Sequence, residues 1–310
     1  MNQEIEKGIK LLKELDLVSY PEEIIAHLIN SVTVGLPIMT VTIPKGKRLV
    51  RSRPNEDISR FNEIKDLSFL PHAKNKKYKR ASTPNNTMFY ASTSAPNQKA
   101  TIHETEITFY ETVPFLNSID SLGYAKITYG CWFPKEDLTL LAIIPYTKKY
   151  EKKNFIGEMK KHYNANLKET PDEYLTKASI DFLELISSEF SKNVEVEKHY
   201  EYMISAIFTE ILMKNNSFDG VFYPSIKSDN TCYNVALTPD IIDKLSLIVV
   251  GECSIFKNKE RIEFCEDAKA LVSENGNFNW IENNSSHLNI LKKIGIKNFE
   301  ELTKKTVANS

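Results

Sequence analysis

The stretch SFDGVFYPSIKSDNTCYNVAL, residues 217–237, decides how the middle of the chain folds. It begins as an apolar strand and then reaches Pro224, which is followed directly by Ser225. Proline cannot donate a backbone hydrogen bond, so within sheets it is confined to edges, strand ends and bulges. Pro224 predicts either an ordinary strand end with a turn serine, or a strand that ends beside a functional site and presents Ser225 there. The stretch alone leaves both interpretations open.

Helical patterns precede this stretch, and further strands surround it. Apolar spacing predicts helices at 2–15, at 21–30, after a capping box at 170–173, and over about 196–213. In that box Thr170 would be the N-cap and Pro171 the first helical residue. Apolar or alternating runs predict strands at 47–54, 87–93, 122–133, 138–145, 217–223, 231–237 and 246–256. Strands gathered on either side of a helical block favour an α+β domain over alternating βαβ units.

The composition is that of a globular protein with a real core. The chain has 310 residues, of which 41% are hydrophobic and 26% are charged. Forty Lys and Arg residues stand against 41 Asp and Glu residues, so no overall basic field favours nucleic acid. No apolar run approaches the roughly 20 residues that a membrane helix needs. The N-terminus has no apolar signal segment, and these features together predict a cytoplasmic protein without a membrane partner.

The cysteines, histidines and glycines exclude several kinds of site. The four cysteines are scattered without a C-x-x-C pair, which fits reduced thiols in the cytoplasm better than disulfides or a zinc knuckle. None of the six histidines stands in an H-E-x-x-H motif or another ligand spacing, so no metal is expected. The chain has no G-x-G-x-x-G and no G-x-x-x-x-G-K-[ST] motif, which excludes the Rossmann and P-loop phosphate cradles.

Three polar residues stand where an ordinary core would not place them. Arg51 follows Leu49 and Val50 in a predicted strand, Glu104 lies in a partly apolar run, and Ser225 follows Pro224. Each also has a simple structural explanation: an edge charge, a solvated neighbour of a lysine, and a turn serine.

A basic run, KNKKYKR at 74–80, ends in Arg80 and leads into an Asn-rich turn and a strand that contains Tyr90. The run itself is typical of a solvated loop, because the chain as a whole carries almost no net charge. Arg80 differs, since an arginine at a loop-to-strand junction can hold a ligand phosphate with a bidentate fork. Tyr90 fits either the core or an aromatic face beside a cationic ligand ring.

Taken in order along the chain, four short segments resemble the RES domain family, which is named for its Arg, Glu and Ser. The segments are RLVRSR (48–53), YKRASTPNNTMFYAS (78–92), KATIHETE (99–106) and FDGVFYPS (218–225). Their order and the final D-G-x-x-Y-P-S carry the resemblance, which spans roughly residues 45–255. The turn between Arg80 and Tyr90 lacks the family's frequent glycine, although Asn can take the same left-handed conformation.

The resemblance implies an α+β fold related to ADP-ribosyltransferase toxins, and an enzyme that breaks NAD⁺ at its nicotinamide–ribose bond. It implies a catalytic domain over 45–256. The helical N-terminal extension over 1–44 and the helical C-terminal tail over 257–310 have no counterpart in the small toxins of the family. In the tail, the sequence pattern predicts helices at 288–295 and 298–306. Many family members are toxins paired with a small antitoxin, so an antitoxin or another regulatory partner is expected. The helical ends would also offer surfaces for a homodimer.

Carried over by position, the resemblance implies a set of site residues. Glu104 would stabilise the positive charge that develops on the ribose, Arg51 would grip a phosphate, and Ser225 would hold a ribose hydroxyl or Glu104. Arg80 and Tyr90 would bind phosphate and nicotinamide, and Arg53 is the near alternative to Arg51. NAD⁺ would be the substrate, with no other cofactor.

Three functions stay open at this point. The enzyme could pass ADP-ribose to water or phosphate, as an NAD⁺ glycohydrolase or phosphorylase. It could instead be an ADP-ribosyltransferase that modifies a protein or a nucleic acid. The third alternative is a binding protein without catalytic activity.

Overall fold

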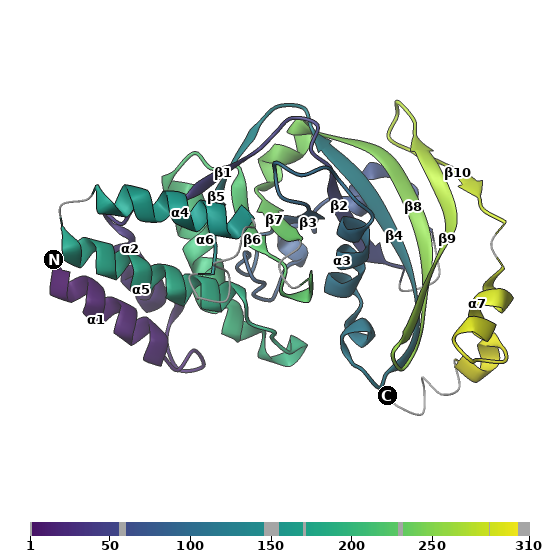
Figure 1. Ribbon diagram of the computed structural model, residues 1–310, viewed down its shortest axis with the longest axis horizontal. Helices are drawn as coiled ribbons and strands as arrows, with labels where there is room; N and C mark the ends of the chain where they lie inside the picture. The colour runs from purple at the N-terminus through teal and green to yellow at the C-terminus, as the bar shows by residue number, and fades with distance from the viewer. Residues whose placement is uncertain are drawn as a thin grey trace.

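The computed structural model describes residues 2–55, 60–145, 155–169, 172–228, 232–284 and 286–302 of the chain. Within these ranges the strands form one ten-stranded sheet in the order β1-β5-β6-β7-β3-β2-β4-β8-β9-β10 (Figure 1). Their bounds are β1 Thr40–Ile43, β2 Leu49–Pro54, β3 Phe89–Thr93, β4 Leu122–Pro134, β5 Leu138–Ala142, β6 Gly220–Pro224, β7 Tyr233–Leu237, β8 Leu245–Asn258, β9 Arg261–Val272 and β10 Phe278–Glu282. Among the strands of the described ranges, only β5 and β6 pair in parallel. The predicted α+β class is confirmed, and no helix of the described ranges is both long and apolar enough to span a membrane.

Helices cover both faces of the sheet at the end that carries β1, β5 and β6 (Figure 1). Their bounds are α1 Asn2–Glu14, α2 Glu22–Thr33, α4 Phe155–Lys168, α5 Glu173–Phe190 and α6 Met203–Asn215. Along β6 the side chains alternate between the faces, as strand geometry requires. Val221 and Tyr223 pack in the core of α1, α2, α5 and α6, whereas Phe222 packs in the core that includes α4. The N-terminal helices therefore share a core with the middle of the chain.

The helix that was predicted to follow a capping box at 170–173 is α5, and its N-cap differs from the predicted one. The N-cap is Asp172, whose Oδ1 accepts hydrogen bonds from the backbone N–H groups of Tyr174 and Leu175 at 2.9 and 3.1 Å. Thr170 and Pro171 lie outside the described residues. The helix predicted over 196–213 also divides, because 196–202 form a 3-10 segment (η5, Val196–Tyr202) and α6 starts only at Met203.

The predicted helical C-terminal tail is wrong in its first half. Residues 261–282 form β9 and β10, which extend the sheet beyond β8. Helix follows in α7, His287–Lys293, and again at 299–302, where the described residues end. The helix predicted over 298–306 is present at 299–302, and residues 303–306 lie outside the described residues. In β9, charged residues stand among the buried ones, so the stretch lacks the apolar content that marks a strand. β9 forms a strand because it pairs with the long β8, although its own sequence does not predict a strand.

Gly220 permits the close approach of β6 and β7. Its φ is +156°, and a Cβ built there would lie 2.2 Å from the backbone oxygen of Ala236. Replacing Gly220 with alanine is expected to destabilise the fold by at least about 3 kcal/mol, because the backbones must separate. The midpoint of urea denaturation measures the loss. Gly35→Ala is the matched control, since Gly35 also has a positive φ, +79°, but has no atom within 4 Å of the added Cβ. Equal losses in both variants would contradict the steric explanation.

Candidate functional site

A cavity of about 360 Å³ lies where β2, β3, β6 and β7 meet a helix that the sequence pattern did not predict, α3, His103–Thr112. Its lining residues are Arg51, Ser52, Arg80, Tyr90, Ala91, Ser92, Thr108, Glu111, Thr112, Tyr223 and Asn234. In Figure 1, α3 stands against the middle of the sheet, beside β2. Three of the predicted site residues, Arg51, Arg80 and Tyr90, are therefore brought together in this cavity.

The cavity contains a carboxylate, but it belongs to Glu111 and not to Glu104. Oε1 of Glu111 accepts hydrogen bonds from Oγ of Ser225 at 2.7 Å and from Nδ2 of Asn234 at 2.9 Å. Oε2 makes no hydrogen bond to any residue in the described ranges. The Glu111 side chain is exposed, so this second oxygen is available to a ligand.

The contact between Ser225 and Glu111 answers the question that Pro224 raises. Pro224 is the last residue of β6, and Ser225, which is fully buried, turns its hydroxyl toward α3. The same hydroxyl accepts a hydrogen bond from the backbone N–H of Lys227 at 3.3 Å. Ser225 does not line the cavity itself, and its contact with the site runs through Glu111.

Asn234 connects the carboxylate to the sheet. It lies on β7, and its Oδ1 accepts a hydrogen bond from Oγ of Ser92 on β3 at 2.9 Å. Since Oδ1 is an acceptor, Nδ2 is left as the donor to Glu111. The chain Ser92–Asn234–Glu111 fixes the carboxylate in one orientation against rigid strands.

Glu104 lies two helical turns before Glu111 on the same side of α3. Its side chain is 0% exposed, and Oε2 accepts hydrogen bonds from the Arg48 guanidinium and the backbone N–H of Thr101, both at 2.7 Å. Burial acts to raise the pKa of Glu104, but hydrogen bonds from Ser94, Arg48 and Thr101 outweigh it, so the pKa lies below its usual value. Glu104 anchors the start of α3 and is outside the cavity.

Arg51 reaches the cavity from β2. Its Nε donates to the carbonyl of Ser68 at 3.1 Å, and an Nη donates to the carbonyl of Tyr90 at 2.9 Å. Burial and the neighbouring Arg53 lower the pKa of Arg51 to about 10, so it stays protonated at neutral pH. No carboxylate of the described residues forms an ion pair with it. Arg53, the predicted alternative, does not line this cavity.

Arg80 also lines the cavity and is held by the segment between α5 and α6. One Nη donates to the carbonyl of Lys192 at 2.7 Å. The guanidinium carbon stands 5.4 Å from the ring centre of Tyr202 and 5.7 Å from that of Tyr223. Like Arg51, Arg80 has no ion-pair partner among the described residues, so the cavity holds two arginines whose charge is not directly neutralised.

The ring of Tyr90 lines the cavity, and its hydroxyl is hydrogen-bonded to the loop that follows Arg80. The hydroxyl oxygen lies 2.8 Å from Oγ of Ser82 and accepts a hydrogen bond from the backbone N–H of Ala81 at 3.0 Å. Burial is the main cause that raises the pKa of Tyr90 to about 12, so it stays neutral. The same two contacts fasten the loop after Arg80 to β3.

That loop keeps its turn without the expected glycine. Asn85 has a φ of +60°, which confirms the prediction that an asparagine would take the left-handed conformation there. The Asn75 side chain donates to the carbonyls of Thr83 and Asn86 at 2.8 and 2.7 Å. These bonds explain how a loop with little regular structure positions Arg80.

Glu111 was not among the predicted site residues, because the sequence pattern did not predict α3. The helix buries Glu104, Thr105 and Thr108 beside apolar residues, so it has no clean apolar stripe. A helical interpretation of 103–112 would have placed Glu104, Thr108 and Glu111 on one side. That polar side is the signal that could have drawn attention to Glu111.

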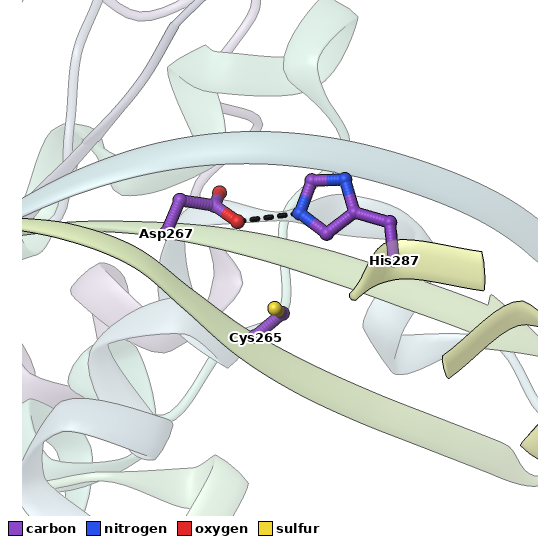
Figure 2. Close-up of side chains that lie close together, drawn as sticks. All are labelled: Cys265, Asp267 and His287. Carbon is purple, nitrogen blue, oxygen red and sulfur yellow. Dashed lines mark hydrogen bonds and ion pairs between the residues drawn. The ribbon is translucent and has the colours of Figure 1, made fainter. Parts of the chain in front are cut away.

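Cys265, Asp267 and His287 bring three potential metal ligands within 4.8 Å of one another, at the junction of β9 and α7 (Figure 2). Nε2 of His287 and Oδ1 of Asp267 are only 2.5 Å apart, and Ser254 donates to Oδ2 at 2.6 Å. Two ligands of a tetrahedral zinc ion would stand about 3.3 Å apart. The geometry is that of a hydrogen-bonded pair that fastens α7 to β9. None of these three residues lines the cavity around Glu111.

Comparison with known proteins does not assign the chain to a family. No family model matches it, and no curated protein matches it. The resemblance to the RES domain family thus stays a prediction.

Proposed function

We propose that the protein cleaves NAD⁺ at the bond between nicotinamide and ribose, and that the cavity around Glu111 is its active site. The observation that carries the proposal is the composition of this one cavity. It holds two arginines that form no ion pair with the described residues, one carboxylate whose Oε2 accepts no hydrogen bond from them, and two tyrosine rings. These are the groups that a dinucleotide with a pyrophosphate and a cationic ring requires.

Each group has a defined part in the reaction. Loss of nicotinamide builds positive charge on the ribose, much as in glycoside hydrolysis. Oε2 of Glu111 stabilises this charge and orients the incoming water or phosphate. Arg51 and Arg80 hold the pyrophosphate, and the ring of Tyr90 stacks on nicotinamide. Nicotinamide leaves as a neutral molecule from a cationic ring, so no acid is needed and one carboxylate is sufficient.

Ser225 and Asn234 are positioning residues in this mechanism. Both donate to Oε1 of Glu111 and leave Oε2 for the substrate. The proposal therefore replaces Glu104 with Glu111 as the carboxylate, and it keeps Arg51, Arg80, Tyr90 and Ser225. An enzyme of this activity would deplete cellular NAD⁺, which is the action of a toxin or a defence effector.

The test is NAD⁺ consumption by the purified protein, followed as nicotinamide release with and without phosphate. Release that yields free ADP-ribose would make it a glycohydrolase, and dependence on phosphate would make it a phosphorylase. Label from NAD⁺ that appears on a protein or a nucleic acid would assign the transferase alternative. NAD⁺ that is neither consumed nor bound in a calorimetric titration would overturn the proposal and favour a binding protein with another ligand.

Replacing Arg80 with lysine is expected to raise the Michaelis constant for NAD⁺ about tenfold, because a point charge replaces a planar fork. Steady-state nicotinamide release measures the change. Arg261→Lys is the matched control, since Arg261 lies on β9 away from the cavity and also donates to a backbone carbonyl. An Arg80→Lys variant with the Michaelis constant of the control would contradict a phosphate role for Arg80.

A further inference from the structure

A second and larger cavity, of about 890 Å³, adjoins the first and shares Arg51 and Ser52 with it. It is lined by Arg53, Lys65, Lys74 and Lys79 together with Phe69 and His72, and we call it the basic groove. Arg51 stands at the junction of the two cavities. A ligand whose phosphates lie at Arg51 can thus extend into both.

The basic groove carries a positive charge that the described residues do not neutralise. The one carboxylate among its lining residues, Asp66, already accepts hydrogen bonds from the backbone N–H groups of Asn62 and Glu63. Lys65 forms an ion pair with Glu63. The ammonium groups of Lys74 and Lys79 form no hydrogen bond or ion pair with the described residues. The groove thus keeps at least two unpaired cations besides its arginines.

Lys79 stands close enough to Arg51 for the two charges to repel. Desolvation, and then the charge of Arg51, lower the pKa of Lys79 from its usual value. A folded chain that holds two like charges together without a counter-ion loses stability. An anionic ligand between them would relieve this repulsion, and the groove has the room for it.

The groove also has an apolar side. Phe69, Leu70 and Pro71 follow one another along it, and the rings of Phe69 and His72 lie 6.0 Å apart and tilted. Aromatic and apolar surfaces of this kind accept the flat face of a purine. The groove therefore combines a place for a base with cations for phosphate.

We infer that the basic groove binds the adenosine half of the dinucleotide, and that Lys74 and Lys79 select a substrate with an additional phosphate on the adenosine ribose. This rests on the proposed function, because it places the pyrophosphate at Arg51 and Arg80. Those two arginines match the two charges of the pyrophosphate, and adenosine itself is neutral. The remaining cations match a ribose phosphate, so the preferred substrate is NADP⁺ and not NAD⁺.

The first experiment compares two ligands that differ by one phosphate, adenosine 2′,5′-bisphosphate and AMP, by calorimetry. The bisphosphate is expected to bind the wild type about tenfold more tightly than AMP. The double variant Lys74→Ala/Lys79→Ala is expected to lose this preference. Lys77→Ala is the matched control, because Lys77 is an exposed residue of the same basic run that does not line the groove. All three lysines are exposed, so thermal denaturation should show the same fold in every variant.

Equal affinity for the two ligands in the wild type, or a preference that survives in the double variant, would overturn the inference. Displacement of the bisphosphate by a short single-stranded RNA that binds more tightly would also overturn it and assign the groove to nucleic acid.

Failure of the inference and failure of the proposed function are distinguishable. If the bisphosphate is preferred but neither NAD⁺ nor NADP⁺ releases nicotinamide, the assignment of the basic groove is supported and the proposed activity is refuted. If kcat/KM is equal for NAD⁺ and NADP⁺ and the two ligands bind equally, the assignment of the basic groove is refuted and the proposed activity stands.

Discussion

Replacing Glu111 with glutamine is expected to lower nicotinamide release at least about 10³-fold and to leave the fold intact. The change removes the negative charge at almost constant volume. The amide oxygen can still accept the hydrogen bonds from Ser225 and Asn234, so the side chain keeps its place. What is lost is the charge on Oε2, and this is the group on which the proposed chemistry depends.

The measurement is steady-state nicotinamide release, with circular dichroism and thermal denaturation to verify folding. Glu106→Gln is the matched control, because Glu106 is on the same helix but is not part of the cavity lining and contacts His103. Wild-type turnover in Glu111→Gln would remove Glu111 from the mechanism. Loss of turnover in both variants would point to damage to α3 and not to a catalytic charge.

Replacing Glu104 with glutamine is expected to act on stability and not on the chemical step. Its carboxylate is fully buried against Arg48, whose side chain is 23% exposed. Removing one partner leaves a largely buried charge without its counter-ion, which costs about 3 kcal/mol, the low end for a buried pair because Arg48 is partly exposed. Urea denaturation measures the loss, and kcat per folded molecule should stay within about threefold of the wild type. A fall in kcat as large as that of Glu111→Gln would show that Glu104 takes part in catalysis.

The stability difference between the wild type and Glu104→Gln should also depend on pH. The pKa of Glu104 in the folded protein lies below its usual value of 4.5, because hydrogen bonds outweigh the effect of burial. Ionised Glu104 thus stabilises the fold above about pH 4.5, and this contribution is lost as the pH falls through the folded pKa. Glutamine cannot titrate, so the difference should narrow below pH 4.5. A difference that stays constant from pH 7 to pH 3 would contradict this account.

Local sequence patterns predicted most of the strands, because a buried strand carries a continuous apolar or alternating run. The runs at 122–133 and 246–256 became β4 and β8, which pair along their whole length. The patterns failed at β9 and at α3, where buried polar residues interrupt the periodicity. In β9 the pairing with β8, and not the local residues, determines the conformation.

The candidate site was predicted in part. Residue type and position left Arg51, Arg80, Tyr90 and Ser225 with structural explanations as well, and it was the resemblance to the RES domain family that assigned them to a site. Three of them line the cavity, and the fourth, Ser225, contacts its carboxylate. Asn234 was not selected, since an asparagine inside a strand gives no sign of its partners. Its role becomes visible only because β7 pairs with β3 and places it beside Ser92.

The sequence by itself determined the α+β class, the end of β6 at Pro224, and the presence of arginines that could hold phosphate. Only the tertiary structure decided which glutamate of α3 faces the cavity. Glu104 and Glu111 are seven residues apart on one side of a helix, so their spacing cannot separate them. Arg48 pairs with the first, and Ser225 and Asn234, which come from more than 100 residues further along the chain, orient the second. Such a choice depends on contacts between distant segments, and these exist only after the sheet has formed.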